Sequence, residues 1–147
     1  MIAVDTNILV HAHRAGAPAH DRSLRWLRHL AEGPTPWGLP VFCLGEFVRV
    51  VTHPWILEPP SSLEQAWSAI DGLLASPTLM VLNPGERFLP LLREALEAAG
   101  ARGNLAFDAQ IAAVCRERGA SRLLTLDRDF ARFRGLTLLS PDEEPDA

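Results

Sequence analysis

The stretch Ile2-Ala-Val-Asp-Thr-Asn7 places a carboxylate directly after a short apolar run. The same pattern returns near the other end of the chain, where Leu123-Leu-Thr-Leu126 leads into Asp127. Short runs that are apolar throughout are typical of strands buried on both faces of a parallel sheet. Ligands of such sheets bind beyond the carboxyl ends of the strands. We therefore expect Asp5 and Asp127 at the edge of the sheet where a functional site lies.

Amphipathic helical patterns alternate with short apolar segments along the rest of the chain. Helices are expected at about residues 8–14, 19–31, 41–52, 62–75, 84–100 and 104–118, with a helical turn at 127–133. Ser61 or Ser62, followed three residues later by an acid or amide, predicts a capping box. Strands are expected at 2–5, 79–82, 123–126 and 136–139, whereas 33–40 (GPTPWGLP) is interpreted as a loop. This alternation predicts an α/β fold of three layers, α/β/α, with a small, mostly parallel sheet.

The composition is that of an ordinary globular domain. Hydrophobic residues make up 48% and charged residues 22% of the 147 residues. The net charge of -4 comes from the last seven residues, PDEEPDA, which hold four acids and no base. Residues 1–140 are expected to form one domain, and 141–147 a disordered acidic tail. Because residues 1–140 are formally neutral, a strongly basic nucleic-acid-binding surface is not expected, although a local basic patch remains compatible.

Basic residues and cysteines give weaker signals. All 14 basic residues are arginine, which suits phosphate recognition but is explained more simply by coding bias in a GC-rich genome. Cys43 and Cys115 lie in apolar helical contexts without a disulfide framework or a metal-binding C-x-x-C motif. We expect both thiols to pack as small hydrophobic groups. Without a recognisable signal peptide or apolar membrane span, the expected location is the cytoplasm.

Two further acids stand alone within apolar helical stretches. Glu46 is the only acid of residues 33–57, and Arg49 could be its surface partner. Asp108 is the only charged residue of 105–115 and shares a helical face with apolar neighbours. A carboxylate in an apolar setting is costly unless something positive compensates it. Both acids therefore call for a partner.

The four acids together predict a metal site. Close carboxylates raise one another's pKa unless a cation is bound. Oxygen-only ligands favour Mg²⁺ or Mn²⁺, which bind a few carboxylates together with phosphate oxygens and can activate water. We expect Asp5, Glu46, Asp108 and Asp127 to hold the ion for phosphodiester hydrolysis. The neighbours expected to orient them are Thr6, Asn7, Asn104 and Thr125, although Thr6 and Asn104 could equally serve as helix caps.

Four motifs, in order, resemble those of PIN-domain ribonucleases and, more narrowly, of VapC toxins from bacterial toxin–antitoxin modules. They are Ile2-Ala-Val-Asp-Thr-Asn7, Leu44-Gly-Glu-Phe47, Gly103-Asn-Leu-Ala-Phe-Asp-Ala109 and Leu124-Thr-Leu-Asp-Arg-Asp-Phe130. The resemblance implies an endoribonuclease dependent on Mg²⁺ or Mn²⁺, with Asp5, Glu46, Asp108 and Asp127 as metal-binding acids. In the last motif Asp129 could share the role of Asp127. The resemblance also implies a homodimer, an RNA substrate and inhibition by a VapB-like antitoxin.

Other functions fit the sequence less well. A module that binds RNA or an antitoxin without cleaving RNA would not need the full set of acids. A haloacid-dehalogenase-type phosphatase would want Asp-x-Asp where the chain has Asp5-Thr-Asn7, and a receiver domain would want a lysine, which the chain lacks. A DNA flap nuclease is the nearest rival enzyme, but such enzymes are longer. Within the ribonuclease hypothesis, arginines of the helix at 19–31 could guide the RNA backbone.

Overall fold

A five-stranded parallel sheet forms the centre of the protein in the computed structural model, which describes residues 1–145. The strand order is β3-β2-β1-β4-β5. The strands are β1 (Ile2–Val4), β2 (Trp37–Pro40), β3 (Leu79–Leu82), β4 (Arg122–Leu124) and β5 (Thr137–Leu139). Because the chain moves outward from β1 through β2 to β3 and then returns to β4, the order reverses between β1 and β4. Such a reversal creates a crevice at the carboxyl ends of the two central strands.

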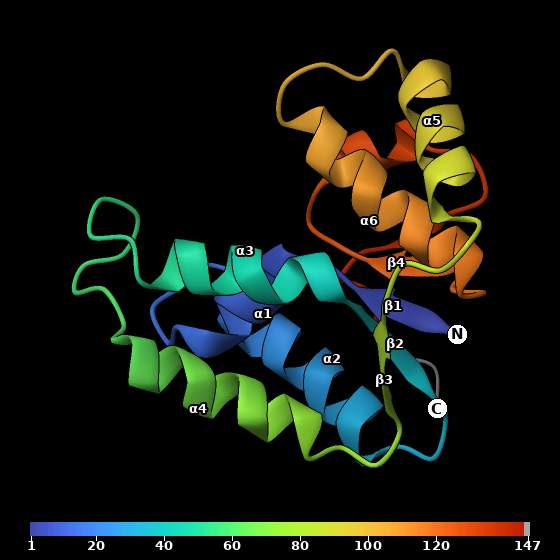
Figure 1. The fold of residues 1–147 in the computed structure, drawn as a ribbon. Helices are drawn as coiled ribbons and strands as arrows, with labels where there is room; N and C mark the ends of the chain where they lie inside the picture. Colours follow the sequence, from blue (N-terminus) through green and yellow to red (C-terminus); the bar gives the residue numbers. More distant parts are fainter. Residues whose placement is uncertain (146–147) are drawn as a thin grey trace.

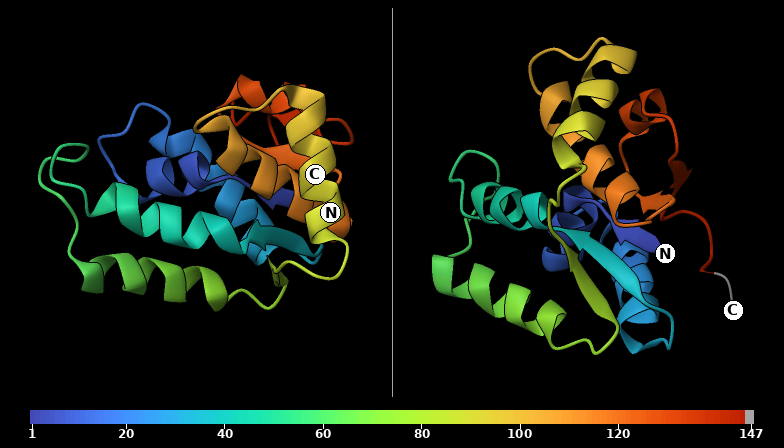
Figure 2. Two further views of the ribbon diagram at one scale, coloured as in Figure 1. Left: turned by 45° about the horizontal axis from the view of Figure 1, so that its top comes forward. Right: turned by 45° about the vertical axis from the view of Figure 1, so that its right-hand side comes forward.

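Helices cover both faces of the sheet (Figure 1). They are α1 (Thr6–His13), α2 (His20–Glu32), α3 (Val41–Val51), α4 (Leu63–Leu74), α5 (Phe88–Ala99) and α6 (Leu105–Glu117), with a 3₁₀ turn η1 (Arg128–Arg132). The first four helices lie on one side of the sheet, and α5 and α6 pack together on the other (Figure 2). This arrangement confirms the expected α/β/α fold. It follows from right-handed crossovers between parallel strands, which change face when the strand order reverses.

The strand β2 is the element that the sequence did not predict, because Trp37-Gly-Leu-Pro40 was interpreted as part of a loop. It pairs with β1 on one side and β3 on the other, and all of its residues are buried. Pro40 is the last residue of the strand and the N-cap of α3, and it lies beyond the residues of β2 that pair with β1. Gly38 has a packing role: a Cβ atom there would lie 2.8 Å from Cδ1 of Leu82. Pro40 is thus accommodated at the end of the strand, and Gly38 is required by the close approach of Leu82 from β3.

Local signals placed most of the helices correctly. The capping box is formed by Ser62 and Gln65, each of which bonds the other's backbone N–H. The helix expected from residue 84 begins only at Phe88. The carboxylate of Glu117 holds the intervening loop, since it accepts hydrogen bonds from the backbone N–H groups of Gly85 (2.8 Å) and Arg87 (2.9 Å). Tertiary contacts therefore hold the loop that precedes this helix.

The hydrophobic core includes both cysteines. Cys43 and Cys115 are fully buried free thiols, as expected. Burial raises the pKa of Cys115 to about 12 and that of Cys43 well above its usual value. Both thiols therefore pack as neutral apolar groups. No helix within residues 1–145 is both long and apolar enough to span a membrane.

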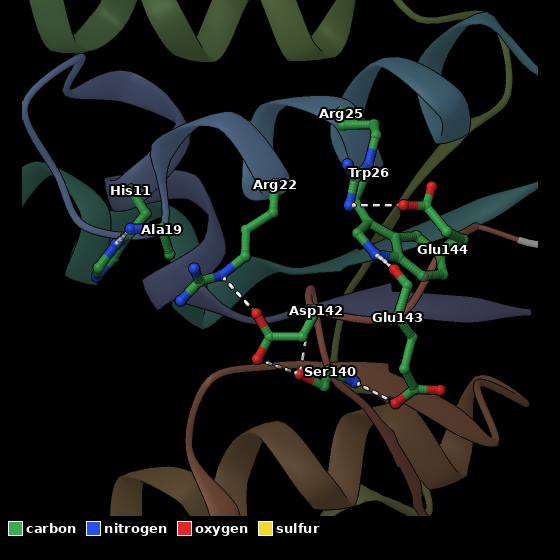
Figure 3. Close-up of polar contacts among 9 residues, drawn as sticks. All are labelled: His11, Ala19, Arg22, Arg25, Trp26, Ser140, Asp142, Glu143 and Glu144. Atoms are coloured by element: carbon green, nitrogen blue, oxygen red, sulfur yellow. Dashed lines mark hydrogen bonds and ion pairs between the residues drawn. The ribbon is translucent and has the colours of Figure 1, made fainter.

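The segment after β5 folds back onto α2 (Figure 3). Two ion pairs and a hydrogen bond join them: Arg22 Nε to Asp142 Oδ1 (2.9 Å), Arg25 Nη2 to Glu144 Oε1 (3.4 Å), and Trp26 Nε1 to the carbonyl oxygen of Glu143 (2.8 Å). The helix offers this segment complementary charges and a buried indole donor, and residues 141–145 form no helix or strand of their own. The disorder of the acidic tail stays a prediction. The last two residues, 146–147, lie outside the described part of the chain.

Candidate active site

Asp5 lies at the junction between β1 and α1, in the crevice where the strand order reverses. The residue is only 4% exposed. As the N-cap of α1, its Oδ1 accepts a hydrogen bond of 2.7 Å from the backbone N–H of Thr6. Its own backbone N–H donates to the carbonyl oxygen of Leu124, the last residue of β4. The two central strands thus hold this carboxylate at their carboxyl edge, where the sequence placed it.

A hydrogen-bond network fixes the second oxygen of Asp5. Oδ2 accepts bonds from Thr125 Oγ1 (2.6 Å) and Asn7 Nδ2 (2.9 Å). Asn7 Oδ1 in turn accepts a bond from the backbone N–H of Leu126, and Thr125 Oγ1 accepts one from that of Asp127. Asn7 and Thr125 therefore orient Asp5 and also shape the segment that follows β4.

Glu46 reaches the same region from α3. Its Oε2 accepts a hydrogen bond of 3.1 Å from the hydroxyl of Thr6, whose backbone N–H donates to Asp5. Its Oε1 lies 4.0 Å from Nη2 of Arg49, which is a loose ion pair. Thr6 therefore bridges two of the four predicted acids, and the N-cap of α1 is Asp5 rather than Thr6.

Asp108 and Asp127 complete the group of acids. Asp108 lies in the first turn of α6 and is partly buried. Asp127 caps η1, and its Oδ1 accepts a hydrogen bond of 2.8 Å from the backbone N–H of Asp129. Asp129 thus supports Asp127 through its main chain. Asn104 precedes α6 without making a side-chain cap bond.

A cavity of about 710 Å³ lies between α3 and α6, and we call it the α3–α6 cavity. Its lining residues are Phe42, Gly45, Glu46 and Arg49 from α3, Asn104, Phe107, Asp108, Gln110 and Ile111 from the α6 segment, and Asp127. Three of the four predicted acids line it, whereas Asp5 is buried and is not part of the lining. Sequence analysis singled out few of the other lining residues, although most of them lie at helical spacing from Glu46 or Asp108.

Two of the four acids, Asp5 and Asp108, have raised pKa values. Burial raises the pKa of Asp5 to about 6, an effect that its hydrogen bonds to Thr125 and Thr6 oppose and that Glu46 and Asp127 reinforce. Burial also raises the pKa of Asp108 to about 7, and the negative charges of the other acids add to the rise. Two carboxyl groups of one site would therefore be partly protonated near neutral pH without a compensating cation. Perturbed acids beside a cavity are typical of functional sites.

The donor set fits a hydrated hard cation. Its oxygens come from carboxylates, with hydroxyl and amide groups nearby, as Mg²⁺ and Mn²⁺ prefer. Within residues 1–145, no three Asp, Glu, His or Cys side chains lie close enough to ligate one ion directly. Mg²⁺ keeps several of its waters when it binds proteins. An ion held partly through water, with its positive charge offsetting the repulsion among these acids, therefore fits the residues present.

Comparison with known proteins agrees with this arrangement. The family model described as "PIN domain" matches residues 2–136, nearly the whole chain. The chain belongs to the PIN-domain family. The match covers all four acids and confirms the resemblance stated from the sequence motifs.

Relatives within the PIN-domain family are named as VapC ribonucleases. The VapC ribonuclease Mb2897 of Mycobacterium bovis is 43% identical, over 96% of this chain and 95% of its own. Ribonuclease VapC31 of Mycobacterium tuberculosis is 34% identical, over 96% and 99%. Among solved structures, VapBC2 from Rickettsia felis, bound to a DNA fragment from its promoter, is 26% identical with a TM-score of 0.67, covering 95% and 98%. Because these proteins align over nearly the whole chain, they support both its PIN-like fold and its family.

Proposed function

We propose that this PIN-domain protein is a metal-dependent endoribonuclease that acts as the toxin of a VapBC-type toxin–antitoxin module. The observation that carries the proposal is the coupling of four acids around one crevice, where burial and mutual repulsion raise the pKa of Asp5 and Asp108. A divalent cation compensates such a group of acids. The names of the relatives at 43% and 34% identity support ribonuclease activity.

The chain's own residues orient the proposed ligands. Thr6, Asn7 and Thr125 fix both oxygens of Asp5, and the hydroxyl of Thr6 also holds Glu46. Asp5 and Asp108 are assigned to direct binding of Mg²⁺ or Mn²⁺, and Glu46 and Asp127 to binding through water or to a second ion. When bound, the ion would activate a water and offset negative charge at the phosphate. Hydrolysis would add water to the phosphorus, break the bond from phosphorus to O3′ and leave a 5′-phosphate and, once the leaving oxygen takes up a proton, a 3′-hydroxyl.

The proposed partners follow from the relatives. A VapB-like antitoxin would inhibit this chain, in line with the VapBC2 complex whose toxin-like chain shares the fold. A homodimer is the proposed assembly, and the cytoplasm, where RNA and antitoxin are available, is the proposed location. Arg22 and Arg25 of α2 are poor candidates for guiding RNA, because both are paired with the acidic segment after β5.

Cleavage of a mixed RNA pool tests the proposed function. Purified protein, freed of antitoxin under denaturing conditions and refolded, is incubated with Mg²⁺, Mn²⁺ or EDTA. The variants are Asp5→Asn and Asp108→Asn, with Asp71→Asn as a matched control because this acid is exposed on α4, away from the cavity. We expect metal-dependent cleavage that both site variants abolish and the control retains. RNA binding without cleavage by the folded wild type under every metal would favour a non-cleaving binding module.

A further inference from the structure

Helices α3 and α6 turn matching faces toward the α3–α6 cavity. The lining residues of α3 are spaced i, i+3, i+4 and i+7: Phe42, Gly45, Glu46 and Arg49. Four residues of the α6 segment repeat this spacing: Asn104, Phe107, Asp108 and Ile111. Residues at these intervals share one face of a helix. Each wall of the cavity is therefore a whole helix face, with one predicted metal-binding acid at the third of its four positions.

Phe107 is an exposed aromatic ring on the α6 wall. Its residue surface is 62% exposed, whereas Ile111, one turn further along the same face, is buried. The ring directly precedes Asp108 in the chain and lines the same cavity. An exposed aromatic face beside an acidic site offers a platform on which a nucleobase can stack, since every base presents a π face. The neighbouring amides of Asn104 and Gln110 add hydrogen-bonding groups suited to the edge of a base.

The α3 wall supplies open space and a positive charge. A Cβ atom at Gly45 would meet nothing within 4 Å, so this part of the wall is clear. The side chain of Arg49 is 62% exposed and lies 4.0 Å from Glu46, beyond hydrogen-bonding distance. Its guanidinium therefore retains donors for a phosphate group, which it can bind through two parallel N–H groups. The cavity volume of about 710 Å³ lies within the range of small-ligand sites.

We propose that the α3–α6 cavity binds one unpaired nucleotide next to the scissile phosphate, with its base stacked on Phe107 and a neighbouring backbone phosphate on Arg49. The inference rests on the proposed ribonuclease function and names the residues of this chain that would hold an unpaired nucleotide of the RNA substrate. Bases within a duplex are already stacked and cannot offer a free face to the ring. Phe107 would thus select for unpaired RNA, while Arg49 offsets the repulsion between the acids and the RNA backbone.

RNA fits this ring better than a protein partner does. A protein-docking site on Phe107 would want apolar surroundings, with charged residues depleted at its centre. The residues that share its cavity include three acids and one arginine. The exposed ring is therefore embedded in polar and charged groups that suit a nucleotide with its metal-bound phosphate.

Equilibrium binding of a short labelled RNA tests the assignment. Binding is measured by fluorescence anisotropy with Ca²⁺ in place of Mg²⁺, to keep the RNA intact, on the full chain and on variants of confirmed fold. Phe107→Leu keeps an apolar side chain but removes the aromatic face, and Phe107→Trp keeps an aromatic face. Leu89→Ala on α5 is the control, because Leu89 is also a strongly exposed apolar residue. We expect Phe107→Leu to raise the Kd roughly 5- to 150-fold, the range that corresponds to base–aromatic stacking. Phe107→Trp and Leu89→Ala should stay within about twofold of wild type.

Two further readouts separate stacking from a general loss of binding. Replacing bases one at a time by abasic sugars should weaken wild-type binding at one position, and Phe107→Leu should remove that sensitivity. Arg49→Gln should reduce the slope of log Kd against log salt by about 0.7, the value for one phosphate contact on a single strand. Arg93→Gln, which alters an exposed arginine of α5, should leave the slope unchanged.

The outcomes distinguish this inference from the proposed function. Wild-type cleavage together with unaltered RNA binding by Phe107→Leu would overturn the inference alone. Loss of self-association or of antitoxin binding in Phe107→Leu, with RNA binding intact, would also overturn it and make the ring a protein contact. Base-specific loss of binding in that variant, without wild-type cleavage under any metal, would retain the nucleotide site and reject the nuclease.

Discussion

The hydroxyl of Thr125 donates a hydrogen bond of 2.6 Å to Oδ2 of Asp5, across 120 residues of sequence. Because β1 and β4 are neighbouring parallel strands, the residues that follow them meet at one edge of the sheet. The same hydroxyl accepts the backbone N–H of Asp127. One threonine thus couples the orientation of two proposed metal-binding acids.

Thr125→Val should impair cleavage while preserving the fold. The substitution keeps the shape of the side chain but removes a hydrogen bond that lowers the pKa of Asp5. Losing this support of a proposed metal ligand should reduce kcat/KM about 10- to 100-fold. The acidic limb of the pH–rate profile should also move to higher pH, because the pKa of Asp5 rises further. Thr125→Ser, which retains the hydroxyl, should recover most of the activity, and equal activity of the valine and serine variants would contradict the assigned role.

The stability of the metal-free protein should fall as pH rises from about 4 to about 8. The pKa of Asp5 is raised from 3.8 to about 6 and that of Asp108 from 3.8 to about 7. Between these values the two carboxyl groups bind more protons in the folded state than in the unfolded state, so a rising pH favours unfolding. The lowered pKa values of His11 and His13 act in the opposite direction, but their shifts are smaller. Thermal melts in EDTA should therefore show a lower Tm at pH 8 than at pH 5. Added Mg²⁺ should recover the Tm at pH 8. The double variant Asp5→Asn/Asp108→Asn should flatten the pH dependence of the Tm, whereas the control Asp71→Asn should leave it unchanged.

The positions of the four acids could be predicted from the sequence better than the other residues that line the α3–α6 cavity. Strand ends locate Asp5 and Asp127, and isolation in apolar helices marks Glu46 and Asp108. The carboxylate interactions of Thr6, Asn7 and Thr125 were also foreseen from adjacency. Which hydrogen bonds form depends on the order of the strands in the sheet, and no local sequence pattern specifies that order. The position of α3 opposite α6 across the cavity depends on it as well.

Strand β2 was not predicted because its glycine and proline have low strand propensity, whereas the surrounding fold stabilises a strand at this position. Glycine and proline disfavour strands in isolation. Here Gly38 lets Leu82 approach, and Pro40 ends the strand. The structure of the segment is thus decided by residues about 40 positions away, on β3.

Gly38→Ala should test that close approach. The added methyl group would lie 2.8 Å from Cδ1 of Leu82 and force the two strands or the leucine to shift. Overpacking of this kind costs about 1–3 kcal/mol. Gly72→Ala is the matched control, because nothing lies within 4 Å of a Cβ atom at this helical position. The control should stabilise the protein by roughly 0.5–1 kcal/mol, and equal effects of the two substitutions in urea melts would contradict the packing role of Gly38.

Deletion of residues 141–147 should destabilise the protein more than neutralising the charges of the segment does. Trp26 is 3% exposed, and its indole N–H donates to the carbonyl oxygen of Glu143. Removing the segment leaves this donor without its protein acceptor and uncovers the ring, so we expect a loss of about 1–3 kcal/mol. The ion pairs of Arg22 and Arg25 are solvent-exposed, and pairs of this kind contribute at most about 1 kcal/mol each. Asp142→Asn with Glu144→Gln should therefore retain most of the stability in urea melts, even at low salt. A double variant as unstable as the deletion would instead assign the anchoring of the segment to its charges.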